Sequence, residues 1–476
     1  MPARRLAIGV GLAVFLTLGF IGPGETYRNP NVLSRIALSF AILDEGSLRI
    51  DRLAPFLGDK AQFAGHFYSD KAPGVSLLAL PVVAVVKLAF QLRGWESGPL
   101  IRPVAGGLVF SSRLIASVWW ASALLSAAAM GVAATAMVRL GIRLGATPAS
   151  ATVAALAFAI ATPAAGWGTT LFGHALAAAL LLIGFARVLA ASEAEERACF
   201  HDSAVAGFVL GLGLLVEFTN AAAVLVIAGF GAWRVIGRPR AGNCLTGAML
   251  GGLAALLPLA IYNATAFGSP LHLAYADAQD FGAMRYGVFG IAVPQPRVVF
   301  ELLAGAARGL LWISPFLVLA PFAYRAAARV LPGDVLAVLV LVPLCFLTLN
   351  AGYAYWDGGF STGPRHLTAG LAFACLPFAL FWERAGFVLR TVVEALLLAS
   401  GVIALACASV DMVSPKLPAG HSPLLDHILP ELLAGRVHNL LAAQFGPGLW
   451  TLAGLPFIWL AVALAIRVLP PARPAR

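Results

Sequence analysis

Long apolar runs separated by short charged segments make up most of this chain. A membrane-spanning helix needs about 20 consecutive, mostly apolar residues, and most of the runs reach this length with few charged side chains. The pattern therefore predicts an all-α polytopic membrane protein with about 11–13 transmembrane helices. The runs cover residues 6–22, 74–92, 108–138, 148–163, 171–191, 203–236, 244–264, 309–323, 333–350, 366–382, 387–410 and 446–467.

The composition excludes a water-soluble protein. The 476 residues are 60% hydrophobic and 11% charged, whereas soluble domains carry roughly 25% charged residues. A soluble enzyme, a DNA-binding protein and a disordered scaffold are excluded as descriptions of the whole chain. Much of the basic excess behind the net charge of +10 lies in clusters between apolar runs, such as Arg234, Arg238 and Arg240. Such clusters are typical of cytoplasmic loops, so we expect a lipid bilayer as partner and no nucleic acid.

The cysteines and the start of the chain predict no cross-linking and no cleavage. None of the five cysteines lies in a C-x-x-C pair, so neither a zinc site nor a disulfide framework is indicated. Residues 1–22 have the basic start and apolar centre of a signal peptide, but no small-x-small cleavage site follows. We expect an uncleaved first helix that starts in the cytoplasm.

Four polar segments interrupt the apolar pattern. They are residues 23–73, 264–307, 351–365 and 411–445. Counting crossings from a cytoplasmic N-terminus, and back from Arg467 and Arg473, puts all four on the periplasmic side of a single membrane domain, residues 1–476. Within the first segment, residues 31–43 have apolar positions at helical spacing, which predicts a short helix along the membrane surface.

The number of membrane crossings between residues 94 and 240 cannot be reconciled with the rest of the topology. If residues 203–236 form one long helix, Arg139 and Arg143 lie outside, against the positive-inside rule. If the run breaks near Glu217, these arginines lie inside, but the first half of the chain then has one crossing too many. The pattern leaves both alternatives open.

Glu25 is the first candidate for catalysis. It follows the first apolar run directly, in GPGETYRNPN, so we expect it near membrane level, where desolvation can raise the pKa of a carboxyl. A carboxylate held there can act as a general base on a hydroxyl or amine. The alternative is a helix cap or an ion pair with Arg28.

Two further clusters suit a phosphate. Asp70 and Lys71 stand before Pro73-Gly74, where an apolar run opens; a helix N-terminus attracts anions, and lysine adds a point charge. Asp357, Arg365 and His366 lie in AGYAYWDGGFSTGPRHL, at the start of another run. The alternatives are an interfacial lysine paired with Asp70, and ordinary aromatic belt residues.

His174 and Glu217 lie inside apolar runs, where ionisable groups are expensive to bury. They are secondary candidates for function. The alternative for each is a hydrogen bond to a neighbouring helix.

These stretches together resemble a known superfamily. The acidic residue after the first span, and the DEGSLRID and FYSDKAPG stretches before the second, are similar to the first outer loop of GT-C glycosyltransferases. The closest branch is family 39, which holds protein O-mannosyltransferases and the lipid A aminoarabinose transferase. The stretches SDKAPG, LFGHALAAA, YNATAFGSP and GGFSTGPRHL resemble a bacterial subgroup known mostly from sequence. The resemblance runs from about residue 20 to residue 385.

The resemblance implies a reaction at the periplasmic face of a bacterial inner membrane. A sugar on a polyprenyl-phosphate donor would be transferred, with inversion, to a glycan, lipid or protein acceptor. Glu25 would be the base, with Asp70 as second candidate, and no cofactor is required, although a divalent metal ion is compatible with the scheme. Residues implied in holding the phosphate or the sugar are Arg28, Asn31, Arg35, Tyr68, Lys71, Asp357, Arg365 and His366.

The chain departs from the family pattern at its first motif. The usual Asp-Glu pair is replaced by Glu25-Thr26. Asp44-Glu45 restores these letters at the far end of the expected surface helix, which makes both residues secondary candidates. Rival interpretations are a transporter or lipid-linked glycan flippase, an oligosaccharide ligase or polymerase, and a non-catalytic assembly subunit. The sugar and the acceptor stay open.

Overall fold

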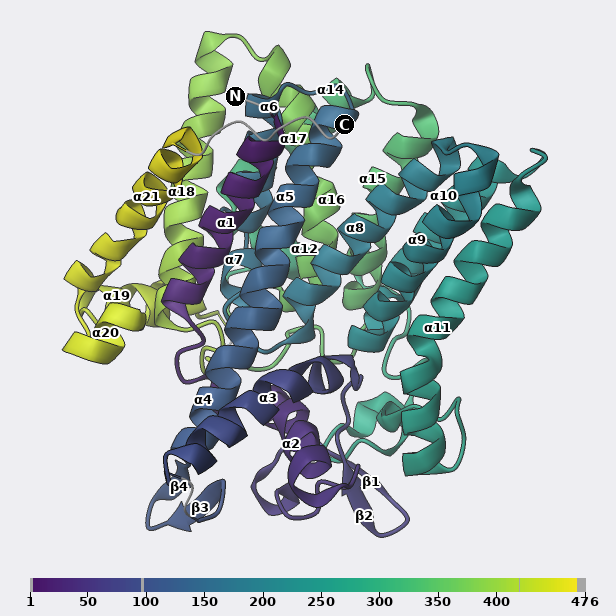
Figure 1. Ribbon diagram of the computed structural model, residues 1–476. Helices are drawn as coiled ribbons and strands as arrows, with labels where there is room; N and C mark the ends of the chain where they lie inside the picture. Colours follow the sequence, from purple (N-terminus) through teal and green to yellow (C-terminus); the bar gives the residue numbers. More distant parts are fainter. Residues whose placement is uncertain (1–2, 96–97, 419, 469–476) are drawn as a thin grey trace.

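The computed structural model describes residues 3–95, 98–418 and 420–468. Within this part of the chain, helices form a bundle and the only strands belong to two short hairpins (Figure 1). Nine helices are long and apolar enough to cross a membrane, with one bent pair and three shorter apolar helices besides. The prediction of an all-α polytopic membrane protein is confirmed. The helices of the bundle are α1 (Ala3–Ile21), α5 (Ala128–Arg143), α6 (Pro148–Ala159), α8 (Gly173–Glu193), α9 (Glu196–Val216), α10 (Ala221–Val235), α11 (Ala241–Phe267), α14 (Ala320–Ala327), α15 (Gly333–Ala351), α16 (Thr368–Cys375), α17 (Pro377–Arg384), α18 (Phe387–Val410) and α21 (Gly454–Val468).

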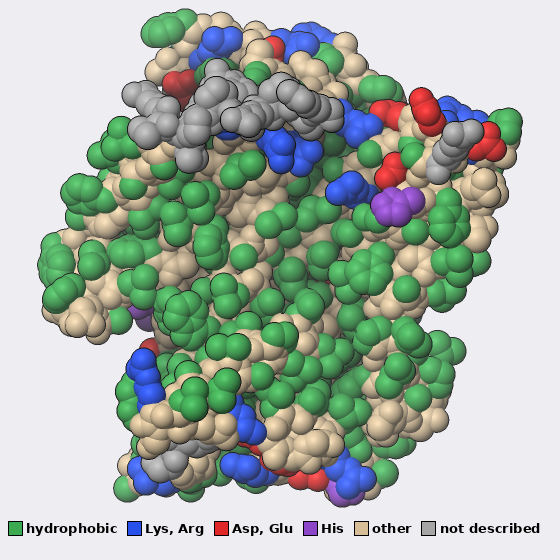
Figure 2. Space-filling model, in the orientation of Figure 1, with side chains coloured by type: hydrophobic (Ala, Val, Ile, Leu, Met, Phe, Trp, Pro, Cys, Tyr) green, Lys and Arg blue, Asp and Glu red, His purple; other side chains and the backbone are tan. Residues whose placement is uncertain are grey.

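The surface has the distribution that a bilayer requires. Hydrophobic side chains cover a broad middle zone, and most lysines, arginines and acidic residues lie at its two ends (Figure 2). The end that carries the four polar segments is called the loop face below, and the other end the opposite face. At the opposite face, Arg234 bridges α10 to the start of α15, with its Nε 2.7 Å from Asp334 Oδ2. Arg143 pairs there with Glu193 at the end of α8.

The run 203–236 breaks at Glu217. Helix α9 ends at Val216, the 3₁₀ turn η4 (Phe218–Asn220) follows, and α10 returns toward the opposite face. Asn220 stabilises the break because its side-chain amide donates to the Gly213 carbonyl at 2.8 Å. The second of the two alternatives for this region is therefore present, and Arg143 lies at the same end of the bundle as Arg234.

Helix α3 (Gly74–Leu92) removes the surplus crossing. Its first residue lies against the last turn of α9 at the loop face, because a Cβ on Gly74 would be 2.5 Å from the Leu215 carbonyl oxygen. Near its other end, Lys87 Nζ is 2.9 Å from Asp44 Oδ1, at the end of α2 (Pro30–Glu45). Both ends of α3 are thus on the loop face, and the helix lies beside α2 below the bundle (Figure 1). The expectation that residues 74–92 cross the membrane was wrong.

The four polar segments are joined into one layer. Hairpin β1 (Ala61–Phe63) and β2 (His66–Tyr68) bridges to the second segment through Ala61 and Ala278. The second segment bridges to the third through Ile291 and Tyr353, and the third meets the fourth where the Thr362 N–H donates to the Met412 carbonyl. A second hairpin, β3 (Ile101–Val104) and β4 (Gly107–Phe110), leads into α4 (Ser112–Ala121).

Helix α2 forms where the sequence predicts a helix, but it is covered by protein. Asn29 caps it by accepting from the Asn31 N–H at 2.9 Å, Pro30 opens its first turn, and Gly46 ends it with φ 61°. All residues from Asn31 to Ala41 are buried. The helix therefore does not lie half-exposed along the membrane surface, because α3 and the loops enclose it.

Cys199 and Cys244 form a disulfide, contrary to the sequence expectation. The two residues are 45 positions apart, so no local motif marks them. They meet because α9 and α11 begin side by side at the opposite face, where Cys199, Val235 and Cys244 form a small buried cluster.

Candidate functional site

A polar cavity of about 250 Å³ opens at the loop face, where all four polar segments meet the ends of α8 and α9. It is called the polar cavity below. Its polar and aromatic lining residues are Asn29, Asn31, Asp59, Asp70, Lys71, His174, Glu217, Tyr275, Phe281, Tyr353, Tyr355, Asp357, Phe360, Arg365, His366 and Lys416.

Lys71 lies on the link from β2 to α3, and its ammonium group contacts two carboxylates. Its Nζ is 2.8 Å from Asp59 Oδ2 and 2.8 Å from Asp70 Oδ2, while Asp70 Oδ1 accepts from the Ser34 hydroxyl at 3.0 Å. Burial opposes the charge of Lys71, but Asp59 and Asp70 outweigh it and raise the lysine pKa. Burial also raises the pKa of Asp70, against the pull of Lys71. Lys71 is therefore a fixed ammonium ion, and both oxygens of Asp70 are engaged.

A buried ion pair connects α2 to the break between α9 and α10. Arg35 Nη2 is 3.3 Å from Glu217 Oε2, and Arg35 Nε donates to Asn31 Oδ1 at 3.0 Å. His174 Nδ1 lies 4.0 Å from the same Glu217 oxygen. Gly173 permits this approach, since a Cβ there would lie 2.1 Å from that oxygen. Arg35 itself lies behind Glu217 and does not line the cavity, so the structure places it as the partner of Glu217.

Arg365 and His366 enter the cavity from the 3₁₀ turn η8 (Arg365–Leu367), which opens α16. The Arg365 guanidinium lies 5.3 Å from the centre of the Phe172 ring and forms no ion pair with another described residue. The His366 ring contacts the rings of His174 and Tyr353 edge to face, at 5.6 and 5.7 Å. Stacking therefore orients Arg365 without neutralising its charge.

Three buried nitrogens around the cavity lack a protein partner. Among the residues that the structure describes, Arg365 Nε, His366 Nε2 and His174 Nε2 are buried and make no hydrogen bond. Buried polar atoms are normally paired, and exceptions call for a bound group. An anion with several acceptor oxygens, such as a phosphate, is suited to nitrogens gathered in this way.

The loop before η8 is held by Arg308, a residue that the sequence did not single out for the site. Its guanidinium donates to the carbonyls of Asp357 and Gly359, the latter at 2.6 Å. Asp357 in turn accepts from the Gly359 N–H at 3.1 Å and pairs with Lys416 at 3.2 Å. Although burial opposes ionisation, these contacts lower the pKa of Asp357. The loop thus presents Asp357 as a carboxylate at the cavity edge.

An apolar groove of about 370 Å³ adjoins the polar cavity. The two share Glu217, Tyr275, Met284, Tyr353 and His366. The groove runs between the start of α10 and the end of α15. Its apolar lining residues are Phe218, Ala221, Ala222, Leu273, Val288, Phe289, Ile291, Phe346 and Leu349.

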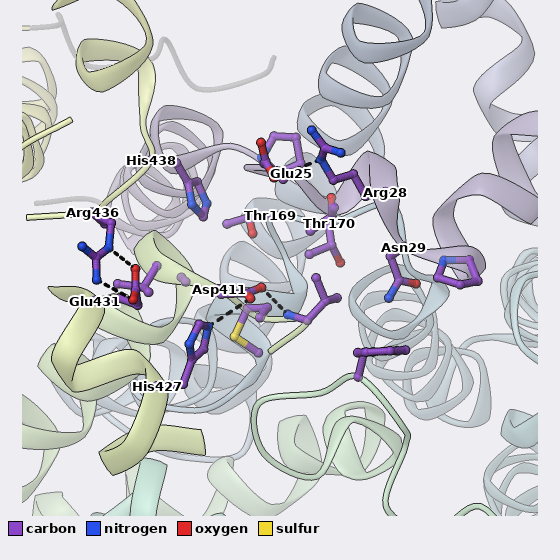
Figure 3. Close-up of a pocket in the computed structure, with 18 residues that line it drawn as sticks. Glu25, Arg28, Asn29, Thr169, Thr170, Asp411, His427, Glu431, Arg436 and His438 are labelled. Atoms are coloured by element: carbon purple, nitrogen blue, oxygen red, sulfur yellow. Dashed lines mark hydrogen bonds and ion pairs between the residues drawn. The ribbon is translucent and has the colours of Figure 1, made fainter. Parts of the chain in front are cut away.

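A second polar cavity, of about 440 Å³, lies on the other side of Asn29, Pro30 and Phe360, which line both (Figure 3). It is called the second cavity below. Glu25 lines it rather than the polar cavity, and pairs with Arg28 at 3.0 Å, as the ion-pair alternative predicts. The Glu25 side chain is 72% exposed, so it does not occupy the desolvated position that its place after the first apolar run predicts.

The chain was compared with known proteins by sequence and by structure. No protein-family model matches the sequence, and no curated protein matches it. In structure, 97% of the chain superposes on 76% of ArnT from Cupriavidus metallidurans, a crystal structure bound to undecaprenyl phosphate, with a TM-score of 0.50 and 13% identity. At this identity the similarity concerns the fold alone. The chain has a GT-C fold.

Not every residue implied by the GT-C resemblance reaches a cavity. Tyr68 is buried against Phe267, with ring centres 5.1 Å apart. Asp44 binds Lys87 and Arg113, and Glu45 lies 3.7 Å from Arg52. The structure thus leaves Tyr68, Asp44 and Glu45 outside both cavities. Conversely, Asp59, Tyr275 and Lys416 line the polar cavity without any signal in the sequence, because loop contacts bring them there.

The side chains at the site do not fit a divalent metal ion. Among the described residues, no group of three or more His, Cys, Asp or Glu side chains is arranged to hold one. Asp59 and Asp70, two carboxylates of the polar cavity, both direct an oxygen to Lys71 Nζ. The ammonium ion takes the position between them that a bridging cation would need.

Proposed function

We propose that this protein is a membrane glycosyltransferase that takes a sugar from a polyprenyl-phosphate donor and transfers it to an acceptor. The observation that supports this most is that the apolar groove adjoins the polar cavity and shares five lining residues with it. A donor of this class has a phosphate between a sugar and a long apolar chain. It needs a cationic pocket that opens into an apolar channel, and these two cavities provide both.

The phosphate would bind at Arg365, His366, His174 and Lys71. Transfer turns a phosphodiester into a phosphomonoester, so negative charge grows on the leaving group. Preorganised donors placed where this charge develops lower the barrier. Arg365 has no carboxylate partner among the described residues and therefore keeps its full charge for the phosphate. The first isoprenoid units would lie along Phe218, Phe289 and Phe346 in the groove.

The reaction would proceed by displacement with inversion. The acceptor hydroxyl oxygen attacks the anomeric carbon, the bond from that carbon to the phosphate oxygen breaks, and its electron pair leaves with the polyprenyl phosphate. The acceptor proton passes to a carboxylate. Glu25 remains the first candidate for this base because it lies in the second cavity, beside Asn29. Asp70 is the weaker candidate, since Lys71 and Ser34 already bind its oxygens.

The loop face would be the periplasmic face of a bacterial inner membrane. Arg143, Arg234 and Arg384 lie at the opposite face, at or near helix ends. Cytoplasmic loops are enriched in arginine and lysine, which supports this orientation.

A flippase for lipid-linked glycans is the main rival, because it too would need an apolar groove beside a polar cavity. Transporters place their charged sites near the bilayer midplane, between broken helices. Here His174 and Glu217 lie at helix ends on the loop face. This location favours chemistry at the membrane boundary.

Transfer from the lipid tests the proposal directly. Protein in lipid nanodiscs would be incubated with a panel of radiolabelled polyprenyl-phosphate sugars and a membrane extract as acceptor source, and label leaving the lipid would be counted. Wild type should transfer label from one donor. Glu25→Gln and Lys71→Met should each lose at least 100-fold in rate, whereas Glu45→Gln, a matched change outside both cavities, should stay within twofold of wild type.

Two results would contradict the proposal. One is donor that crosses the bilayer of a proteoliposome with its sugar–phosphate bond intact, which is flippase behaviour. The other is no loss of label from any donor when the panel includes the host's own glycolipids. If Glu25→Gln keeps transfer while Lys71→Met loses it, the glycosyltransferase proposal holds and Asp70 becomes the candidate base.

A further inference from the structure

The second cavity is lined mostly by parts of the chain that do not line the polar cavity. Its walls are the link between α1 and α2, the turn before α8 with Thr169 and Thr170, the end of α18, and the fourth polar segment. At about 440 Å³ it is the larger of the two polar cavities and within the range of ligand pockets, about 300–1,000 Å³. Gly24 packs against the lining residue His438, because a Cβ there would lie 2.7 Å from the His438 ring.

Its charged groups are arranged as pairs. Asp411 Oδ2 is 3.3 Å from His427 Nε2, Glu431 Oε1 is 2.7 Å from Arg436 Nη2, and Glu25 pairs with Arg28 (Figure 3). Each arginine in the lining is thus matched by its own carboxylate.

Neither histidine of the lining is an unmatched cation. Burial lowers the pKa of His438, so this ring is neutral at pH 7, and its Nε2 is buried without a hydrogen-bond partner. His427 faces Asp411. The second cavity therefore offers carboxylate acceptors, guanidinium donors and hydroxyls, but no unmatched cation comparable to Arg365 in the polar cavity.

We propose that the second cavity is the acceptor site, and that it takes a neutral sugar residue of a glycan chain. This inference rests on the proposed function. Paired carboxylates and guanidinium groups can exchange hydrogen bonds with many hydroxyls at once, whereas a phosphate-bearing ligand needs uncompensated cations. The two cavities share Asn29, Pro30 and Phe360 in their walls, which places a bound acceptor directly beside the donor cavity. Glu25 lies on the acceptor side, where the proton is released.

The test separates the two substrates by their half-saturating concentrations. Glu431→Gln and Arg436→Gln would be compared with Arg285→Gln, which is exposed on the loop face and lines neither cavity. Acceptor would be supplied as neutral glycans released from the membrane extract, as glycan-free lipids, or as protein. Undecaprenyl phosphate binding would be measured on the same samples.

We expect Glu431→Gln and Arg436→Gln to raise the half-saturating glycan concentration at least tenfold. Their affinity for undecaprenyl phosphate should stay within twofold of wild type, whereas Lys71→Met should show the reverse. Arg285→Gln should change neither. Equal acceptor saturation in all variants, a parallel loss of undecaprenyl phosphate affinity, or label accepted only by protein or glycan-free lipid would each overturn the inference.

A binding readout that needs no transfer keeps this test apart from that of the proposed function. Val413 lines the second cavity and is partly exposed. The released glycans should slow the labelling of Val413→Cys by a methanethiosulfonate reagent at least fivefold above the wild-type background, and undecaprenyl phosphate should not. Protection without any sugar transfer would contradict only the enzyme. Transfer without protection would contradict only the acceptor site.

Discussion

At the scale of single residues, Lys71 and Arg365 of the polar cavity are held in different ways. Lys71 is neutralised by Asp59 and Asp70, at 2.8 Å each, while Arg365 rests on the face of Phe172 with its charge unmatched. Arg365 thus attracts a phosphate more strongly, and the main effect of Lys71 is to prevent the buried Asp70 and the partly buried Asp59 from repelling the phosphate. Replacing Lys71 would leave both carboxylates unpaired, which is why its loss should cost more than one ion pair.

Lys71 also predicts the pH dependence of donor binding. The folded protein raises the lysine pKa above its usual 10.5, because Asp59 and Asp70 favour the charged form. A raised pKa means that the contribution of the ammonium ion is fully present below pH 10.5 and is lost only as the pH rises further. The second ionisation of a phosphomonoester is complete above roughly pH 7. Undecaprenyl phosphate affinity, measured in nanodiscs, should therefore be flat from pH 7.5 to 9.5, and a tenfold fall in this interval would show that Lys71 titrates there.

The sequence predicted which residues gather at the polar cavity better than it predicted the location of Glu25. Asp70, Lys71, Arg365 and His366 stand beside helix starts, and helix starts at one face of a bundle converge. Glu25 also stands beside a helix start, but it pairs with Arg28 three positions later and lines the second cavity. No pattern in a single sequence reports how two loops divide a space, so the pair of cavities was not predictable.

At the scale of elements, the turn from Asp357 to η8 is held in position by a residue from another segment of the chain. Arg308 reaches it from the link between α12 (Pro296–Leu303) and α13 (Leu310–Ile313), and binds two of its carbonyls. No sequence motif marks Arg308, because its partners are backbone atoms some 50 positions away. When a side chain binds backbone carbonyls, no oppositely charged partner residue appears in the sequence to indicate the contact.

Arg308→Gln should therefore weaken donor binding without touching the donor. A hydrogen bond from a charged group contributes roughly 1.5–3 kcal/mol, and its loss would let Asp357 and Arg365 move. We expect undecaprenyl phosphate affinity to fall about tenfold, with a small decrease in the melting temperature in detergent. Arg308→Lys should recover part of the affinity, since an ammonium ion can still reach one carbonyl, and Arg285→Gln should behave as wild type. A lower melting temperature with unchanged affinity would mean that the turn does not position the site.

At the scale of the whole molecule, the topology closes only when α3 is taken out of the membrane. Its length and hydropathy are those of a span, so composition alone assigns it wrongly. The decisive contacts are non-local. Gly74 lies against the end of α9, and Lys87 against Asp44. With α3 at the loop face and the chain broken at Glu217, Arg143 and Arg234 reach the same side of the membrane, and the conflict with the positive-inside rule disappears.

This topology predicts which positions a membrane-impermeant maleimide can reach. Arg93 follows the end of α3, Arg285 lies in the second polar segment, and Arg238 lies between α10 and α11 at the opposite face; all three are exposed. In spheroplasts, Arg93→Cys and Arg285→Cys should be labelled at once, whereas Arg238→Cys should require permeabilisation, with wild type as background. The decisive result is that Arg93→Cys and Arg285→Cys are labelled alike, because this expectation holds whichever way the protein is inserted. If Arg93→Cys instead required permeabilisation like Arg238→Cys, α3 would cross the bilayer. Its two ends would then lie on opposite sides of the membrane, and the arrangement of the polar cavity around Asp70 and Lys71 described above would be wrong.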